Sequence, residues 1–221
     1  MDVRTFTGGG FGQNAYLTVC DGSAAAIDPG AGAGRMADEI RSQALRLEAI
    51  VLTHAHVDHI EGVHVVHALA PAAPIWIHPD ALAMYRALPH QAAAFGLSVE
   101  PQPEPTHRLA HGQRLEIGAC ALDVRDAPGH APGHVILVAT DRSFAIVGDV
   151  VFRGSIGRTD LPGGDFHRLM RAIREEVLSL PDATVLYSGH GPPTTVGHER
   201  IGNPFLVPHF GGDVPGRGEL A

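Results

Sequence analysis

Residues 54–59, with the sequence HAHVDH, place three histidines and one aspartate within six positions. Neutral imidazoles and a carboxylate are the ligand set that zinc, iron and manganese find in proteins. His54 and His56 are two positions apart, and Asp58 and His59 follow at once. Two histidines on one helix face need a separation of four residues, so this is a different arrangement. It fits a tight loop leaving a strand, in which alternate side chains point one way and the next pair turns toward a second point.

Three further candidate ligands follow apolar runs that are typical of strands. His130 stands in a Pro-Gly turn, Asp149 follows the run SFAIVG, and His190 follows TVLYSG. A glycine immediately precedes each of them, which indicates an unusual backbone turn that aims the side chain. Functional residues concentrate in loops at strand ends. The sequence therefore predicts one site assembled from several strand ends.

The segments HAHVDH, PGHAPGH, GDVVF and GHGP resemble, in order and spacing, those of the metallo-β-lactamase superfamily. The stretches GDVVFRGSIGRTDLPGGD and GHERIGNPFL resemble more narrowly its short glyoxalase II-type hydrolases, and the similarity runs from IDPG to about Phe205. The resemblance implies an α/β fold, a four-layered αβ/βα sandwich of two mixed sheets flanked by helices. It also implies a single domain over residues 1–221, without the helical C-terminal glutathione-binding domain of full-length glyoxalase II enzymes.

The resemblance assigns seven ligands to two divalent metal ions, with zinc as the first choice and iron or manganese as alternatives. The ligands are His54, His56 and His130 for the first ion, Asp58, His59 and His190 for the second, and Asp149 bridging both. His134, at the head of the next strand, is expected to donate a hydrogen bond to the ligand set rather than to belong to it. The β-lactamases themselves carry Cys or Ser at the position of Asp149, so antibiotic hydrolysis is disfavoured.

The implied activity is thioester hydrolysis by a metal-bridging hydroxide, with Asp58 and Asp149 as the catalytic carboxylates. Two ions about 3.5–4 Å apart lower the pKa of a shared water toward about 7. A thiolate leaving group, with a pKa near about 8.5, departs without protonation, so no separate general acid is required. The expected substrate is an S-2-hydroxyacylglutathione such as S-lactoylglutathione, which gives glutathione and a 2-hydroxy acid.

Glutathione recognition is where the chain departs most from the resemblance. Residues 191–221, which follow His190, are too few for the C-terminal helical domain. Pro192 replaces a tyrosine of that family, and residues 158–160 (RTD) replace its Lys-x-Tyr. Arg158 is still expected to bind a substrate carboxylate. An arginine in place of lysine carries no information here, because all 16 basic residues of the chain are arginine.

Two other functions stay open at this point. His54, His130 and Asp149 alone form the two-histidine, one-carboxylate set of non-haem iron oxygenases. Persulfide dioxygenases of the superfamily bind one iron in this way and share the GRTD of residues 157–160. The segments LPGGD and GHGPPTT favour the hydrolase. The third and least favoured function is a non-catalytic metal-binding module, which the complete set of seven ligands argues against.

The composition and charge of the chain disfavour several classes of protein. The formal charge is −8, with 24 acidic and 16 basic residues and no basic stripe, which disfavours nucleic-acid binding. The N-terminus lacks the features of a signal peptide, and the apolar runs are short and interrupted by proline, so we expect a cytoplasmic protein without membrane association. Cys20 and Cys120 stand a hundred residues apart without a CxxC motif, which predicts two reduced, buried thiols. The oligomeric state is left open.

The elements that must position the site follow from hydrophobic periodicity. Strands are predicted at 15–21, 24–30, 47–53, 73–78, 114–117, 120–126, 134–140, 143–148 and 184–189. Helices are predicted at 33–47, 60–69 and 166–180. The Pro-rich stretch 100–109 predicts a surface loop. Hairpins in both halves, with helices between strands, indicate two packed sheets with helices outside.

The remaining histidines and glycines are assigned no chemistry. His64 and His67 fall on one predicted helical face, which is covered or solvated. The histidines without a surrounding motif are His78, His90, His107, His111, His167, His198 and His209. PGAGAG lacks the third glycine of a dinucleotide-binding fingerprint, because Arg35 stands there, and predicts a strand-to-helix turn. GGGFG (8–12) predicts a hairpin turn or a loop at the site entrance. Asp28 either supports the histidine loop from behind or begins a turn.

Overall fold

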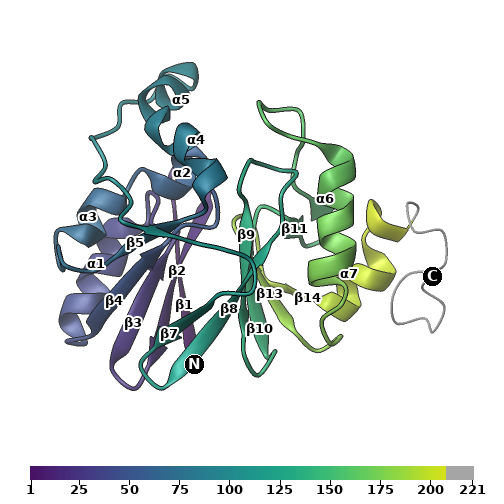
Figure 1. The fold of residues 1–221 in the computed structure, drawn as a ribbon, viewed down its shortest axis with the longest axis horizontal. Coiled ribbons are helices and arrows are strands. Elements are labelled where there is room, and N and C mark those ends of the chain that lie inside the picture. Colours follow the sequence, from purple (N-terminus) through teal and green to yellow (C-terminus); the bar gives the residue numbers. More distant parts are fainter. Residues whose placement is uncertain (208–221) are drawn as a thin grey trace.

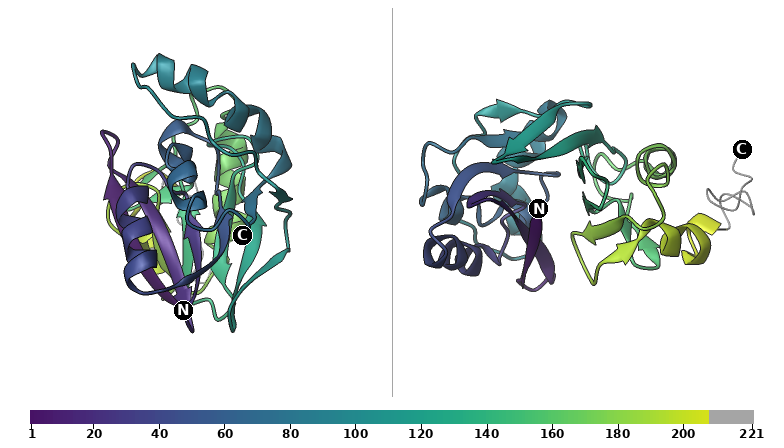
Figure 2. Two further views of the ribbon diagram at one scale, coloured as in Figure 1. Left: turned by 90° about the vertical axis from the view of Figure 1, so that its left-hand side faces the viewer. Right: turned by 90° about the horizontal axis from the view of Figure 1, so that it is seen from below.

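The computed structural model describes residues 1–207, and two six-stranded sheets pack face to face within them (Figure 1). Helices cover the outer side of each sheet, so that four layers follow one another across the molecule (Figure 2). Each sheet contains both parallel and antiparallel neighbours. The expected αβ/βα sandwich of two mixed sheets is confirmed.

The first sheet has the strand order β1-β2-β3-β4-β5-β6. Its strands are β1 (Asp2–Gly8), β2 (Gln13–Cys20), β3 (Ser23–Ile27), β4 (Arg46–Val51), β5 (Ile75–Ile77) and β6 (His107–Arg108). The helices on its side are α1 (Ala33–Ser42), α2 (Val57–Ile60), α3 (Val63–His67), α4 (Leu82–Arg86) and α5 (Leu88–Ala94). The strands β3 and β4 are parallel, so their carboxyl ends lie at the same edge.

The second sheet has the order β14-β13-β10-β9-β8-β7. Its strands are β7 (Arg114–Ile117), β8 (Cys120–Asp126), β9 (Val135–Ala139), β10 (Phe144–Gly148), β13 (Val185–Ser188) and β14 (Thr194–Thr195). A small hairpin, β11 (Val151–Phe152) with β12 (Ser155–Ile156), follows β10. Helix α6 (Phe166–Ala172) continues into a π-helical turn (Ile173–Val177), and α7 (Val196–Gly202) follows β14.

Apolar side chains fill the space between the two sheets. Representative residues are Tyr16, Ile27 and Val51 from the first sheet and Leu122, Leu137 and Ile146 from the second. Strands β3, β9 and β10 are buried along their whole length, because another sheet covers one face and helices cover the other. This core fixes the two sheets relative to each other and brings their loop edges together.

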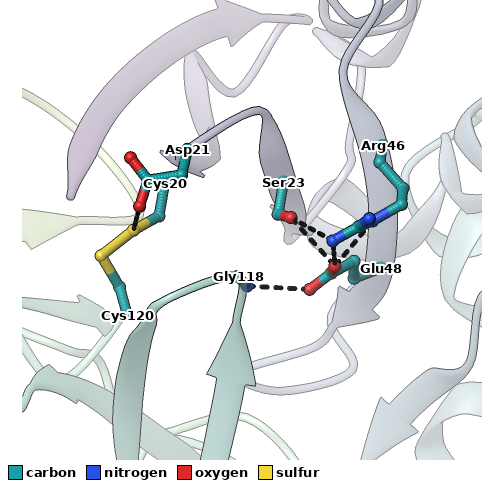
Figure 3. The surroundings of a disulfide bond; sticks show 7 residues. All are labelled: Cys20, Asp21, Ser23, Arg46, Glu48, Gly118 and Cys120. Carbon is teal, nitrogen blue, oxygen red and sulfur yellow. Dashed lines mark hydrogen bonds and ion pairs between the residues drawn. A yellow bond between two sulfur atoms is a disulfide. The ribbon is translucent and has the colours of Figure 1, made fainter.

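Cys20 and Cys120 form a disulfide that joins the end of β2 to the start of β8 (Figure 3). The prediction of two reduced thiols is therefore wrong. The two Cα atoms are 6.1 Å apart although 100 residues separate them in sequence. Sheet packing, which the spacing of cysteines does not encode, brings them together. Beside the disulfide, Glu48 accepts a hydrogen bond from the backbone N–H of Gly118 (3.0 Å), so a second contact ties the sheets at this point (Figure 3).

Most predicted strands are confirmed, and the helix predictions need correction. Helix α1 ends at Ser42 rather than at residue 47, because Ala44 adopts a left-handed backbone (φ 50°) and the next residues form β4. The predicted helix 60–69 is two helices, interrupted at Gly62, where an added Cβ would lie 2.3 Å from the Gly30 carbonyl oxygen. The predicted helix 166–180 ends at residue 177 as α6 and the π-helical turn.

Several elements were missed by the sequence patterns. These include β1, the helices α4, α5 and α7, the short strands β11, β12 and β14, and the short strand β6 inside the predicted loop 100–109. None of the helices in residues 1–207 is long and apolar enough to cross a membrane.

Candidate metal centre

The HAHVDH loop joins β4 to α2, and its two parts have different backbones. His56 is extended (φ −70°, ψ 149°) and precedes the first helical residue, Val57. Asp58 and His59 therefore lie in the first turn of α2, while His54 and His56 lie on the extended segment before it. This change of backbone explains how four neighbouring side chains reach two different points, as the spacing predicts.

Two groups of candidate ligands come together at the loop edge. In the first group, His54, His56 and His130 place their ligand atoms within 4.8 Å of one another, with His56 Nδ1 2.9 Å from His130 Nε2. In the second group, the ligand atoms of Asp58, His59 and His190 also lie within 4.8 Å of one another. Asp58 contacts both histidines. Its Oδ2 atom lies 3.2 Å from His190 Nε2 and 3.8 Å from His59 Nε2.

Asp149 lies between the two groups. Its Oδ1 atom is 3.4 Å from His59 Nε2, and its Oδ2 atom is 3.5 Å from both His130 Nε2 and His190 Nε2. The carboxylate thus faces a histidine of the first group and two histidines of the second. A side chain in this position can contribute to both groups at once.

Four of the five clustered histidines use their second ring nitrogen to contact the protein. The contacts are His54 Nδ1 with Thr53 Oγ1 (3.0 Å), His59 Nδ1 with Asp28 Oδ2 (3.0 Å), His130 Nδ1 with the Arg158 carbonyl (2.8 Å) and His190 Nδ1 with the Phe11 carbonyl (3.0 Å). Such contacts fix the ring and its tautomer, and they are usual for metal-bound histidine. In each case Nε2 is the nitrogen left facing the cluster.

Three buried polar atoms of the cluster have no hydrogen-bond partner: His54 Nε2, His59 Nε2 and Asp149 Oδ1. An unpaired buried polar atom costs about 1–3 kcal/mol, and native proteins contain few of them. All three are atoms that can coordinate a metal ion, so their lack of partners fits a metal site. The residues present therefore suit divalent metal ions.

Asp28 fills both of the roles that the sequence left open, because it supports the histidine loop from behind and also turns the chain. The side chain is buried and accepts hydrogen bonds from the Thr53 backbone N–H (2.7 Å) and hydroxyl (2.6 Å), besides its contact with His59. Its left-handed backbone (φ 48°) turns the chain at the end of β3. One carboxylate thus holds both the start of the loop and one ring of the second group.

Burial and neighbouring charges shift the pKa values in the cluster. Burial lowers the pKa of His56 to about 4, which keeps this ring neutral and able to coordinate. Burial would raise the pKa of Asp149, but His59 and His190 outweigh it and hold the carboxyl pKa well below its usual range. Burial would lower the pKa of His190, but Asp149 and Asp58 raise it to about 10. Negative charge therefore gathers where cations would sit.

His134 lies outside both groups but has a different role from the expected one. Its Nε2 atom accepts a hydrogen bond from the backbone N–H of Asp149 (3.1 Å), so the expected donor is an acceptor. Its ring stacks on His54 with centroids 4.6 Å apart. The side chain therefore positions the backbone of Asp149 and one face of His54.

Glycine is required before each of the three strand-end ligands, for two different structural reasons. Gly129 and Gly148 adopt left-handed or related backbones (φ 133° and 48°), as the sequence predicts. Gly189 does not have a positive φ. It is needed because an added Cβ would lie 2.1 Å from Asp149 Oδ1.

A cavity of about 170 Å³ opens onto the cluster and is named here the metal-centre cavity. Besides candidate ligands it is lined by Phe11, Val57, Gln91, Phe95, Arg158 and Leu161. Arg158 is exposed and forms two 2.7 Å contacts with Asp160. Its carbonyl, which holds His130, is a contribution that the sequence did not indicate. The GGGFG segment is confirmed as the hairpin turn between β1 and β2 and supplies Phe11 at this entrance.

The other described histidines lie outside the clusters found in residues 1–207. His64 contacts Gln102, and His78 accepts from the Asp80 backbone N–H, for example. His209 lies outside the described residues. PGAGAG forms the turn between β3 and α1, as predicted, and its last two residues begin α1.

The sequence of this chain is similar to those of known proteins, and the similarity identifies its family. Residues 8–190 match the model of the metallo-beta-lactamase superfamily. The chain belongs to this superfamily. It is 34% identical over 209 residues to the hydroxyacylglutathione hydrolase GloC of Haemophilus influenzae, which covers 93% of this chain and 98% of that protein.

Solved structures of this superfamily show the same fold. TTHA1623, solved in a di-iron-bound form, is 38% identical with a TM-score of 0.85, covering 92% of this chain and 100% of that one. The B3 metallo-beta-lactamase BLEG-1 is 34% identical with a TM-score of 0.83, covering 93% and 99%. Together with the His/Asp clusters, these relatives support divalent metal binding by a metallohydrolase-like enzyme.

Proposed function

We propose that the chain is a binuclear metallohydrolase that cleaves thioesters, with S-2-hydroxyacylglutathione such as S-lactoylglutathione as substrate. The observation that carries the proposal is the position of Asp149, within 3.5 Å of histidines from both groups. A mononuclear centre needs only one group, and the Asp58, His59 and His190 group would then be surplus. The relative named as a hydroxyacylglutathione hydrolase supports this substrate class.

The proposed ligands are His54, His56 and His130 for one ion, Asp58, His59 and His190 for the other, and Asp149 for both. Zinc is the proposed metal, with iron or manganese as alternatives. Bound there, two divalent ions would supply a water with its pKa lowered toward about 7 and a positive field for the developing oxyanion. The chain itself supplies the negative charge and neutral imidazoles that hold such ions.

The cavity lining suits a substrate with a good leaving group. Apart from the proposed ligands, its described lining residues are apolar or uncharged except for Arg158, and none of them is a general acid at neutral pH. A thiolate leaves without being protonated, whereas an amine or alkoxide would need a proton donor. A thioester therefore matches this cavity better than an amide or a simple ester does.

Arg158 is the proposed contact for a glutathione carboxylate. Apart from the proposed metal ligands, it is the one basic residue among the described residues lining the cavity, and its guanidinium is exposed. It would have to exchange its contacts with Asp160 for the substrate, which costs little at an exposed ion pair.

The test is a set of assays on one metal-loaded preparation. We expect hydrolysis of S-D-lactoylglutathione, loss of turnover in Asp149→Ala, and much lower turnover of a chromogenic cephalosporin. A His56→Ala variant serves as the control for the metal site. Oxygen consumption on glutathione persulfide with no thioesterase activity would instead establish the iron dioxygenase that uses His54, His130 and Asp149.

A further inference from the structure

Three large apolar side chains are exposed near the metal-centre cavity, and two of them, Phe11 and Phe95, line it. Phe11 is 43% exposed, Phe95 50% and Leu97 38%. Phe11 comes from the hairpin turn between β1 and β2, and the other two come from the segment after α5. The rings of Phe11 and Phe95 pack edge to face with centroids 5.2 Å apart. Clustered exposed apolar side chains of this kind mark binding surfaces.

This apolar group lies between the metal-centre cavity and a larger one, and Phe11 lines both. Phe11 and Phe95 line the metal-centre cavity, while Phe11 and Leu97 line a second cavity of about 580 Å³, named here the distal cavity. Glycines of the hairpin turn and of the turn after β3 form part of its wall, together with Val65 and Val99. A volume of this size is in the range of ligand-binding sites. A ligand reaching from the cluster past Phe11 would enter the distal cavity.

The charges of the distal cavity limit what can occupy it. Its described lining contains Glu61 and Glu100 but no arginine. The two carboxylates of a glutathione group would be repelled there, whereas Arg158 lies beyond β12, in the other half of the fold. The part of the substrate that fits the distal cavity therefore carries no negative charge, and the apolar lining of Phe11, Leu97 and the two valines favours an apolar group.

We propose that the distal cavity binds the acyl chain of the thioester, and that the enzyme prefers apolar acyl groups longer than lactoyl. This inference rests on the proposed thioesterase function. Phe11, Phe95 and Leu97 would cover the chain as it leaves the carbonyl group, while the thiol part extends toward Arg158. A three-carbon lactoyl group would leave most of the distal cavity empty.

The test compares S-butanoyl- and S-octanoylglutathione as substrates, with S-methyl- and S-hexylglutathione as non-hydrolysable ligands. We expect the wild type to favour octanoyl by about tenfold or more in kcat/KM, since a fully buried methylene is worth about fourfold and partial burial less. S-hexylglutathione should likewise bind more tightly than S-methylglutathione by calorimetry. Phe95→Ala and Leu97→Glu should reduce both preferences at least fivefold. Phe205→Ala, which removes a 49% exposed ring elsewhere, should leave them unchanged.

The outcomes separate the two proposals. Turnover of all acyl groups at equal rates, with no effect of Phe95→Ala on either ratio, would overturn the acyl assignment and leave the thioesterase standing. Preferential binding of S-hexylglutathione that depends on Phe95, without turnover of any thioester, would support the distal cavity and overturn the proposed function.

Discussion

The Asp28→Asn substitution tests whether the support behind the ligands sets metal affinity. Asparagine tolerates the left-handed backbone found at this position (φ 48°), so the turn is kept. The amide oxygen can keep the 2.7 Å hydrogen bond from the Thr53 N–H, which directs the NH₂ group toward His59 Nδ1. His59 Nδ1 must then accept, and the ring proton moves to Nε2, the atom that faces Asp58 and Asp149.

The magnitude follows from the two contacts of Asp28 Oδ2, the atom that the NH₂ group replaces. This atom contacts His59 Nδ1 and accepts a hydrogen bond from the Thr53 hydroxyl. Replacing a supporting partner of a metal ligand weakens binding about 10–100-fold, which corresponds to about 1.4–2.7 kcal/mol. Competitive titration against a chelator measures it, and we expect one of two metal affinities to fall by this amount. Asp38→Asn, the same change at an exposed position in α1, should leave both affinities unaltered. Affinities within twofold of the wild type in Asp28→Asn would refute the reasoning.

Two further predictions concern the proton that metal binding displaces from His190 and the disulfide between Cys20 and Cys120. Because Asp149 and Asp58 raise the pKa of His190 to about 10 against the effect of burial, the metal-free ring is protonated at pH 7, and metal must displace this proton. For each proton displaced, the apparent metal affinity should therefore weaken about tenfold when the pH is lowered by one unit. The heat of metal binding in calorimetry should also depend on the buffer that takes up the proton. Equal heats in all buffers would contradict this prediction. Reduction of the Cys20–Cys120 disulfide, or Cys20→Ser, should lower the free energy of unfolding by about 2–4 kcal/mol in urea titrations, because it releases a loop of about 100 residues. An unchanged urea midpoint would show that the cross-link contributes nothing.

Local patterns predicted the strands and the candidate ligands at their ends because both depend on short-range sequence, whereas the division of the ligands into two groups came from the resemblance to the metallo-β-lactamase superfamily. The strands β8 and β10 follow from continuous or alternating apolar runs, and the HAHVDH spacing requires a loop that changes backbone at Val57. His130 and Asp149 follow strands of the second sheet, and they meet this loop of the first sheet because the core brings the loop edges of the two sheets together.

Features that depend on the packing of the two halves were not predictable in this way. The disulfide and the approach of the Phe11 carbonyl to His190 join segments of the two halves whose distance in space is not encoded locally. Helices α4 and α5 were missed because their sequence, rich in alanine and interrupted by Pro89, shows a weak amphipathic pattern. Phe95 gains its role only from its packing on Phe11.

The most direct test of the account is hydrolysis of S-D-lactoylglutathione by protein whose zinc, iron and manganese content has been counted. The account predicts turnover with nearly two ions per chain, and loss of turnover with loss of one ion when Asp58 is replaced by alanine. Full activity with a single ion per chain would contradict the binuclear centre at Asp149.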